Sequence, residues 1–362
     1  MMWAILKIYI GVGLLTIYVH AAHSDDDSDD DSYDDEKETL TYNDFITTEE
    51  DPIGKSRFSK IRKNGTEVAI KVSSDSNASI HEYEVYKDLE VVGNPEAEDY
   101  GISQIYFYGK QPFGFVTVLS LFEFNIHELK TGERTRAVLF EEDDYLILFR
   151  NFVRQIKYVH SRSVRHDDIK PINIMIRRGR SFLIDFDKSS KMNQPILRGT
   201  PKFMSRRAHE HALHEDKSNL NGHPCDDWEC FLYTIADIAD VPLRWFEIKA
   251  EREEHVEEIW NIQNLKQNTE DTTDEICAHF AGKIKLVEVI REFAKETFKT
   301  NGLPNYNHVE QFITARLEDL RGPPAVFSWL KDARRTEAIN ELTNCPPATT
   351  RAIRQPKAHP GR

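Results

Sequence analysis

A polar loop set between apolar segments is the sequence feature that most constrains how this chain of 362 residues can fold. The loop reads HDDIKPIN over residues 166–173, directly after a long amphipathic helix predicted over residues 144–161. The segment SFLIDFD, residues 181–187, follows as a short strand whose apolar side chains predict burial. This order predicts that the polar residues of the loop and the aspartates at the end of the strand meet in one site.

The sequence before the loop is dominated by predicted strands. Asn64-Gly65 lies between two of them and favours a two-residue hairpin, because both turn positions need positive φ angles. Lys71 falls near the end of the second strand, and Glu82 falls on the helix that follows. The predicted strands cover residues 57–63, 66–72, 104–109 and 113–122, and the predicted helix covers residues 79–92.

The sequence after the loop is dominated by predicted helices, because apolar residues recur there at helical spacing. The chain is long enough for two lobes around a shared cleft. We therefore predict an α+β fold with a small strand-rich lobe and a larger, mostly helical lobe. The predicted helices of the second lobe cover residues 226–240, 253–265, 281–298 and 307–320.

Six short motifs resemble those of one known family in type and in order. They are VAIK ending at Lys71, Glu82 in HEYEVYK, HDDIKPIN at 166–173, DFD at 185–187, RGTPKFMS at 198–205 and DDWECF at 226–231. In this order the motifs resemble the eukaryotic protein kinases, and in style casein kinase I and related fungal Ser/Thr kinases. The resemblance covers about residues 42–320 and implies a two-lobed protein kinase-like fold, with an N-lobe over 42–121 and a C-lobe over 122–320.

The resemblance implies ATP as the phosphoryl donor and Mg²⁺, or alternatively Mn²⁺, as the cofactor. Lys71 would clamp the α- and β-phosphates and would itself be held by an ion pair with Glu82. Asn173 and Asp185 would hold the metal ion, because Mg²⁺ prefers oxygen ligands.

The resemblance implies that residues of the polar loop carry out the phosphoryl transfer. Asp168 would accept the proton of the acceptor hydroxyl, and Lys170 would neutralise charge on the transferred phosphoryl group. Glu210 would lie in a buried structural ion pair. The other matched residues would support the site: Leu119 behind the adenine pocket, the hinge Ser120, Leu121 and Phe122 beside adenine, and His166, Phe186, Thr200 and Asp227 as structural or regulatory residues.

Three positions depart from the family pattern. The glycine-rich loop over the phosphates retains Gly54 alone, which predicts weaker nucleotide binding because side chains replace hydrogens near the phosphates. Asp167 replaces an arginine that would pair with a phosphorylated activation loop, so activation by that route is not expected. Asp187 replaces the glycine of D-F-G, and we expect either a cap of a helix or turn or a third metal ligand there.

Two functions remain open at this point. An active kinase would transfer the γ-phosphate of ATP to Ser or Thr hydroxyls of protein substrates, and every catalytic side chain for this is present. A pseudokinase would keep the fold as a binding or regulatory module, as the eroded glycine loop and Asp187 suggest. A small-molecule phosphotransferase is disfavoured by Lys170-Pro171 and by the long helical half of the chain.

The first residues predict export from the cytosol. An apolar run from Ile8 to Val19 follows a single basic residue, which is typical of a signal peptide over residues 1–21 cleaved after Ala21; an uncleaved single-pass anchor is the alternative. The protein is then secreted or lumenal, and it contacts a membrane only if the segment stays attached. Asn64 and Asn77 begin glycosylation sequons in predicted turns.

Composition limits the possible partners and indicates where the folded region begins and ends. The net charge is −14, and ten acidic residues crowd into residues 25–38, so residues 22–41 predict an acidic disordered spacer. No basic groove is apparent, which excludes nucleic acid as a partner, and we expect a monomer. Residues 321–362 are Pro-rich and weakly basic, and they predict a mobile tail with at most one short helix, near residues 328–342.

Four cysteines leave their redox state open. Cys225, Cys230, Cys277 and Cys345 allow three complete pairings in an oxidising compartment, and buried free thiols are the alternative.

Overall fold

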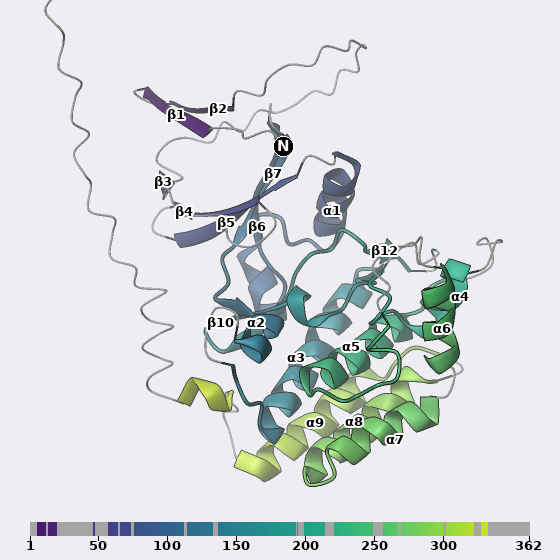
Figure 1. Ribbon diagram of the computed structural model, residues 1–362. Helices are drawn as coiled ribbons and strands as arrows, with labels where there is room; N and C mark the ends of the chain where they lie inside the picture. The colour runs from purple at the N-terminus through teal and green to yellow at the C-terminus, as the bar shows by residue number, and fades with distance from the viewer. Residues whose placement is uncertain are drawn as a thin grey trace, which may run out of the picture.

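The computed structural model describes two lobes, a strand-rich one that carries α1 and a larger helical one (Figure 1). This confirms the predicted α+β class. The structure describes residues 6–11, 14–19, 46–47, 57–63, 66–73, 76–111, 114–132, 137–192, 194, 199–213, 221–248, 256–266, 269–299, 302–321 and 327–331.

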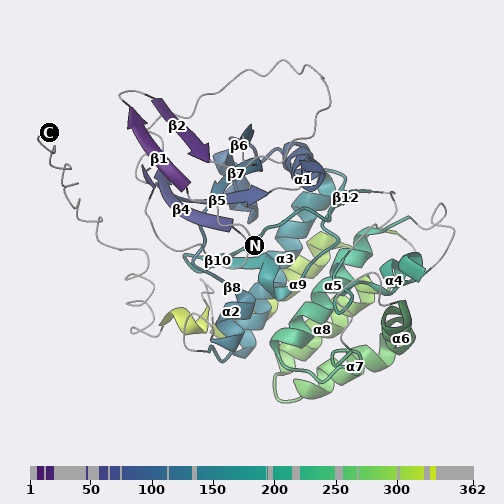
Figure 2. The same cartoon turned by 45° about the horizontal axis from the view of Figure 1, so that its top comes forward.

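The small lobe is built on an antiparallel sheet in the order β3-β4-β5-β7-β6. Its strands are β3 (Ile46–Thr47), β4 (Arg57–Lys63), β5 (Thr66–Ser73), β6 (Ile105–Gln111) and β7 (Gly114–Ser120). The helix α1 (Ser76–Asp88) packs on this sheet, as Figure 2 shows, with Val85 and Leu89 buried. It ends before the predicted residue 92, because Glu90 turns the chain with a φ of 54°. The register pairs Lys71 of β5 with Thr117 of β7.

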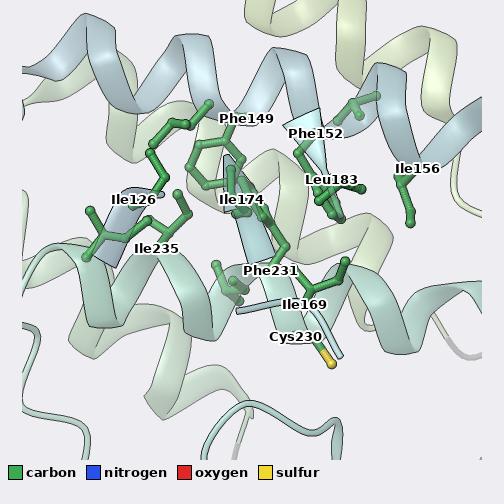
Figure 3. Close-up of a cluster of buried hydrophobic side chains, with 14 of the residues drawn as sticks. Ile126, Phe149, Phe152, Ile156, Ile169, Ile174, Leu183, Cys230, Phe231 and Ile235 are labelled. Carbon is green, nitrogen blue, oxygen red and sulfur yellow. The ribbon is translucent and has the colours of Figure 1, made fainter. Parts of the chain in front are cut away.

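The large lobe is formed by helices packed around α3 and α5. Phe152 of α3 stacks on Phe231 of α5 with ring centroids 3.9 Å apart, and Phe149 meets the same ring edge-on (Figure 3). The helix α7 was not predicted from the sequence. The helices are α2 (Ile126–Thr131), α3 (Glu142–Ser161), α4 (Arg206–Leu213), α5 (Pro224–Ile238), α6 (Val256–Lys266), α7 (Thr269–His279), α8 (Ile284–Thr297) and α9 (Tyr306–Arg321).

Short strands between the lobes frame the polar loop. A three-stranded sheet joins β8 (Phe124–Asn125), β10 (Ile174–Arg177) and β11 (Arg180–Leu183), and β9 (Val164–Arg165) pairs with β12 (Ser190–Lys191). The loop therefore leaves one strand pair and enters the other. The 3₁₀ helix η2 (Pro171–Asn173) lies at its end, and η1 (Pro95–Tyr100) connects the region of α1 to β6.

The end of the described chain packs onto the large lobe. Phe327 and Trp329 are buried in the core, and η4 (Ser328–Lys331) lies against α3, where the Ser328 backbone N–H and hydroxyl each donate to Asp144 at 2.5 Å. The packed region thus extends beyond the expected boundary at residue 320.

The amino-terminal residues are described only in part. β1 (Leu6–Gly11) and β2 (Leu14–Val19) pair as an antiparallel hairpin, and none of the described helices is long and apolar enough to cross a membrane. The expected signal peptide stays a prediction. The acidic spacer, Gly54 and Asn64 lie outside the described residues.

The cysteines and the second sequon are placed by the structure. Cys225, Cys230 and Cys277 are buried free thiols, which is the alternative to a paired framework, and Cys345 lies outside the described residues. Asn77 is exposed, as a glycan acceptor must be, but it lies in the first turn of α1 rather than in the predicted turn.

Candidate active site

Asp168 is fixed by groups on both of its carboxylate oxygens. The backbone N–H and the hydroxyl of Thr200 donate to Oδ1 at 3.0 and 2.7 Å, and Lys170 Nζ lies 2.6 Å from Oδ2. Lys170 Nζ also donates to the Thr200 hydroxyl oxygen at 2.9 Å. These contacts hold a negatively charged acceptor and an ammonium side by side, the arrangement that removal of a hydroxyl proton beside a phosphoryl group requires.

Asn173 lies beside the residue that precedes Asp185, because the Ile184 backbone N–H donates to the Asn173 carbonyl oxygen at 3.1 Å. Asn173 Nδ2 donates to the Asp168 carbonyl oxygen at 3.0 Å, which leaves the amide oxygen available as an acceptor. No cluster of three His, Cys, Asp or Glu in the described part of the chain could hold a metal ion. An amide oxygen and one carboxylate fit Mg²⁺, which keeps several of its ligands from water or phosphate.

Lys71 joins the two lobes through two carboxylates. Its Nζ lies 2.9 Å from both oxygens of Glu82 on α1 and 2.8 Å from Oδ1 of Asp185. Burial works against the charge on Lys71, but the two carboxylates outweigh it and raise its pKa above the ordinary value. Burial also opposes the charge on Asp185, yet Lys71 holds the pKa of that carboxyl below its ordinary value. The predicted pair of Lys71 and Glu82 is therefore formed, with α1 docked against the site.

A stack of buried side chains supports the site from α1 to α5. The Phe186 ring lies 5.5 Å from Tyr86 of α1 and 4.6 Å from His166, centroid to centroid. Asp227 of α5 accepts the backbone N–H groups of His166 and Asp167 at 2.9 and 2.8 Å. The structural or regulatory roles of His166, Phe186 and Asp227 stay predictions. The sequence assigned Tyr86 only to the apolar face of the predicted helix.

The expected adenine hinge follows the end of β7. Leu119 is buried, Ser120 is wholly buried and its hydroxyl donates to Glu98 at 2.7 Å, and Phe122 packs against Phe182. The Ser120 backbone N–H donates to the Gln104 carbonyl oxygen at 3.2 Å. These contacts fix the chain as it passes between the lobes, and the role of residues 119–122 toward adenine stays a prediction.

Asp167 is paired with a buried cation that the sequence reasoning missed. Arg165, also fully buried, donates from Nε and Nη2 to the two carboxylate oxygens of Asp167 at 3.0 and 3.2 Å, and the Ser190 hydroxyl donates to the same carboxylate. Arg165 also donates to the Lys191 and Gln194 carbonyl oxygens at 3.2 and 3.1 Å. Asp167, which has a φ of 61°, thus anchors an arginine that holds the segment after Asp185.

The side chain of Glu210 is exposed on α4, so the burial predicted for it is wrong. Glu229 of α5 is buried instead: it accepts the Arg206 backbone N–H at 2.9 Å, the Arg206 Nε at 3.2 Å and the Tyr233 hydroxyl at 2.6 Å. The sequence signal was a glutamate two residues after Asp227, on the same buried helix.

Asp187 contacts the ammonium of its neighbour Lys188 at 3.0 Å. This contact identifies neither a cap nor a metal ligand, so both predictions for Asp187 remain open.

The chain matches known proteins over the region just described. A family model for the protein kinase domain matches residues 49–300. Casein kinase I homolog 2 of Schizosaccharomyces pombe is 26% identical to the chain over 239 residues, which cover 59% of this chain and 49% of that protein. The matched region therefore spans about half the length of the curated relative.

Proposed function

This chain belongs to the protein kinase family, and from that premise we propose that it transfers the γ-phosphate of ATP to Ser or Thr hydroxyls of protein substrates. The likeness to a casein kinase I homolog supports Ser and Thr as acceptors. The net charge and the lack of a basic groove give no support to nucleic acid as a substrate.

The described residues divide the reaction between them. Lys71 binds the phosphates with its ammonium already oriented by Glu82, so little ordering is left for the moment of binding. Asp168 accepts the proton of the acceptor hydroxyl and orients its oxygen toward the phosphoryl group. Lys170, 2.6 Å from Asp168, stabilises the negative charge that develops on the phosphoryl oxygens. Asn173 and Asp185 would hold Mg²⁺, which would supply neutralisation of the charge on the phosphates.

One observation favours catalysis over the pseudokinase alternative: Lys71 contacts Glu82 and Asp185 at the same time. These residues come from a strand, a helix and a loop far apart in sequence, and all three must converge before phosphates can be bound productively. The departures at Gly54 and Asp187 support only a lower affinity for nucleotide.

We also propose that the protein works outside the cytosol, as a secreted or lumenal enzyme. The apolar run at residues 8–19 after Lys7 supports this, and the exposed position of Asn77 is compatible with a glycan.

The experiment uses residues 22–362, labelled ATP with Mg²⁺ or Mn²⁺, and protein substrates that contain Ser and Thr. Asp168→Asn should lower transfer about a thousandfold, the scale of a lost general base, while a nucleotide-induced rise in melting temperature persists. Glu210→Gln is the matched control, because it also neutralises one acidic side chain, and it should transfer like the wild type. Absence of transfer together with a nucleotide-induced rise that Lys71→Ala removes would identify a nucleotide-binding pseudokinase.

A further inference from the structure

Lys266, the last residue of α6, is buried to an unusual degree for a lysine, with no exposed surface. Its Nζ donates to the carbonyl oxygens of Pro201, Lys202 and Met204 at 3.1, 3.2 and 2.7 Å. Three N–H groups thus meet three carbonyl oxygens, which satisfies every donor of an ammonium group.

Aromatic rings enclose the same ammonium. Nζ lies 4.6 Å from the centroid of Tyr233 and 5.3 Å from that of Trp245, within the range of cation–π attraction. The indole N–H of Trp245 donates to the Lys202 carbonyl oxygen at 3.1 Å. The cation is therefore held by oriented carbonyl groups and ring faces rather than by a direct ion pair.

The carbonyl groups that Lys266 binds belong to the segment 200–205, which lies beside Asp168. Thr200 at its start donates twice to Asp168, and Ser205 at its end donates from its hydroxyl to Asp226 at 2.8 Å. Lys266 holds the middle of the segment. A polypeptide that presents a hydroxyl to Asp168 must pass over residues that adjoin Thr200. The shape of the segment 200–205 therefore determines how the polypeptide binds.

We propose that Lys266 is a positioning residue for the protein substrate, because the hydrogen bonds from its Nζ shape the segment 200–205 and so set the surface on which the acceptor polypeptide lies. The inference rests on the proposed function and deepens it. Lys266 touches neither the nucleotide residues nor Asp168, so its effect falls on recognition of the polypeptide and not on recognition of ATP.

The first experiment compares the full chain with Lys266→Met, which keeps the length of the side chain and removes the charge and the donors. A Ser peptide is the acceptor. The KM for the peptide should rise about tenfold, equivalent to one hydrogen bond from a charged donor, while the KM for ATP stays unchanged. Lys266→Arg, which retains a cation, should recover part of the loss. An unchanged KM for the peptide, or an equal rise in both KM values, would overturn the proposal.

Lys283→Met is the matched control. Lys283 also donates to a backbone carbonyl oxygen, that of Phe140, and also lies over two aromatic rings, those of Tyr145 and Phe280. It has no contact with the segment 200–205. The control variant should therefore keep the wild-type KM for the peptide; a rise equal to that of Lys266→Met would contradict a role specific to this segment.

Hydrogen–deuterium exchange separates this inference from the proposed function, because it needs no activity. The amides of Phe203 and Met204, which donate to the Thr200 carbonyl oxygen, should exchange about tenfold faster in Lys266→Met than in the wild type or in Lys283→Met. If the wild type transfers no phosphate, the proposed function fails, and exchange still decides whether Lys266 shapes the segment. Equal exchange in all three proteins would overturn the inference.

Discussion

Lys71 carries the contacts that bind the lobes into one site. Replacing Lys71 by Met removes the cation that meets Glu82 and Asp185, both within 2.9 Å. We expect the variant to remain folded and to lose most of the nucleotide-induced rise in melting temperature. Thermal denaturation with and without ATP and Mg²⁺ measures this. Lys110→Met removes an exposed lysine from the same sheet and should respond as the wild type does; a full response by Lys71→Met would remove Lys71 from nucleotide binding.

Arg165 and Asp167 form a buried ion pair, and its disruption should lower the free energy of unfolding. Asp167→Asn leaves the Arg165 charge buried without its carboxylate, so the free energy of unfolding should fall by about 3 kcal/mol. Urea unfolding monitored by tryptophan fluorescence measures the change. Asp187→Asn, at a more exposed carboxylate, should change stability by less than about 1 kcal/mol. Equal effects of the two substitutions would show that Asp167 does not balance the arginine.

The sequence predicted single residues well where a motif fixed both their type and their spacing. Lys71 and Glu82 form the predicted pair, and each was assigned from several neighbouring letters. The roles of Asp168 and Asn173 stay predictions. Arg165 was missed because the carbonyl oxygens that it binds belong to Lys191 and Gln194, which are distant from it in the sequence. Glu210 was misplaced because a single letter of a degenerate motif was carried over, whereas burial on α5 selects Glu229.

At the scale of elements, α6 ends in a lysine whose burial makes stability depend on pH. Burial lowers the pKa of Lys266 to about 7, against the opposing effect of Glu229, whereas the unfolded chain has a pKa of about 10.4. Between these values the unfolded chain binds the additional proton, so the free energy of unfolding should rise with pH by up to about 1.4 kcal/mol per unit. His209, whose pKa burial lowers to about 3, stays neutral in this range.

Urea unfolding of the wild type and Lys266→Met at pH 7, 8 and 9 tests this dependence. The increase in the free energy of unfolding with pH that Lys266 causes should be absent from Lys266→Met. Parallel pH dependences in the two proteins would show that Lys266 does not change its affinity for protons on folding.

The short helix η4 is expected to stabilise the large lobe. Trp329 is buried and stacks on Phe327 with ring centroids 5.2 Å apart, so Trp329→Ala should cost about 3 kcal/mol through the cavity it leaves. Trp260→Ala is the matched control, because Trp260 is 55% exposed on α6, and its effect should stay below about 1 kcal/mol. Chemical denaturation compares the two. Equal losses would mean that η4 adds no net stability to the lobe.

Periodicity predicted the elements with a strong pattern and missed those formed by context. The strands 57–63 and 66–72 were expected from the Asn-Gly turn between them, and a helix over 144–161 from an amphipathic stripe. The helix α7 has few apolar residues in its sequence TEDTTDEICAH, and only Ile276 and its neighbours on the packed face select a helix there. Phe327 and Trp329 were assigned to a tail because a Pro-Pro pair precedes them, and their burial depends on distant residues of α3.

At the scale of the whole molecule, α1 and the segment after Asp185 hold the lobes in one arrangement. His81 of α1 lies 2.7 Å from the Ser189 carbonyl oxygen, and Lys191 of β12 pairs with Asp88 at the other end of α1. Both views show β12 beside α1 (Figures 1 and 2). Arg165 fixes the same segment from the large lobe. The site is therefore assembled by contacts within the chain.

The most direct test of catalysis at this site is a single-turnover measurement of phosphate transfer from labelled ATP to a Ser-containing protein, in the presence of Mg²⁺, by protein never exposed to another kinase. We expect transfer by the wild type without prior phosphorylation, and a loss of about a thousandfold in Asp168→Asn with ATP binding retained. Absence of transfer by a wild type that binds ATP, or equal transfer by Asp168→Asn, would contradict catalysis by this site.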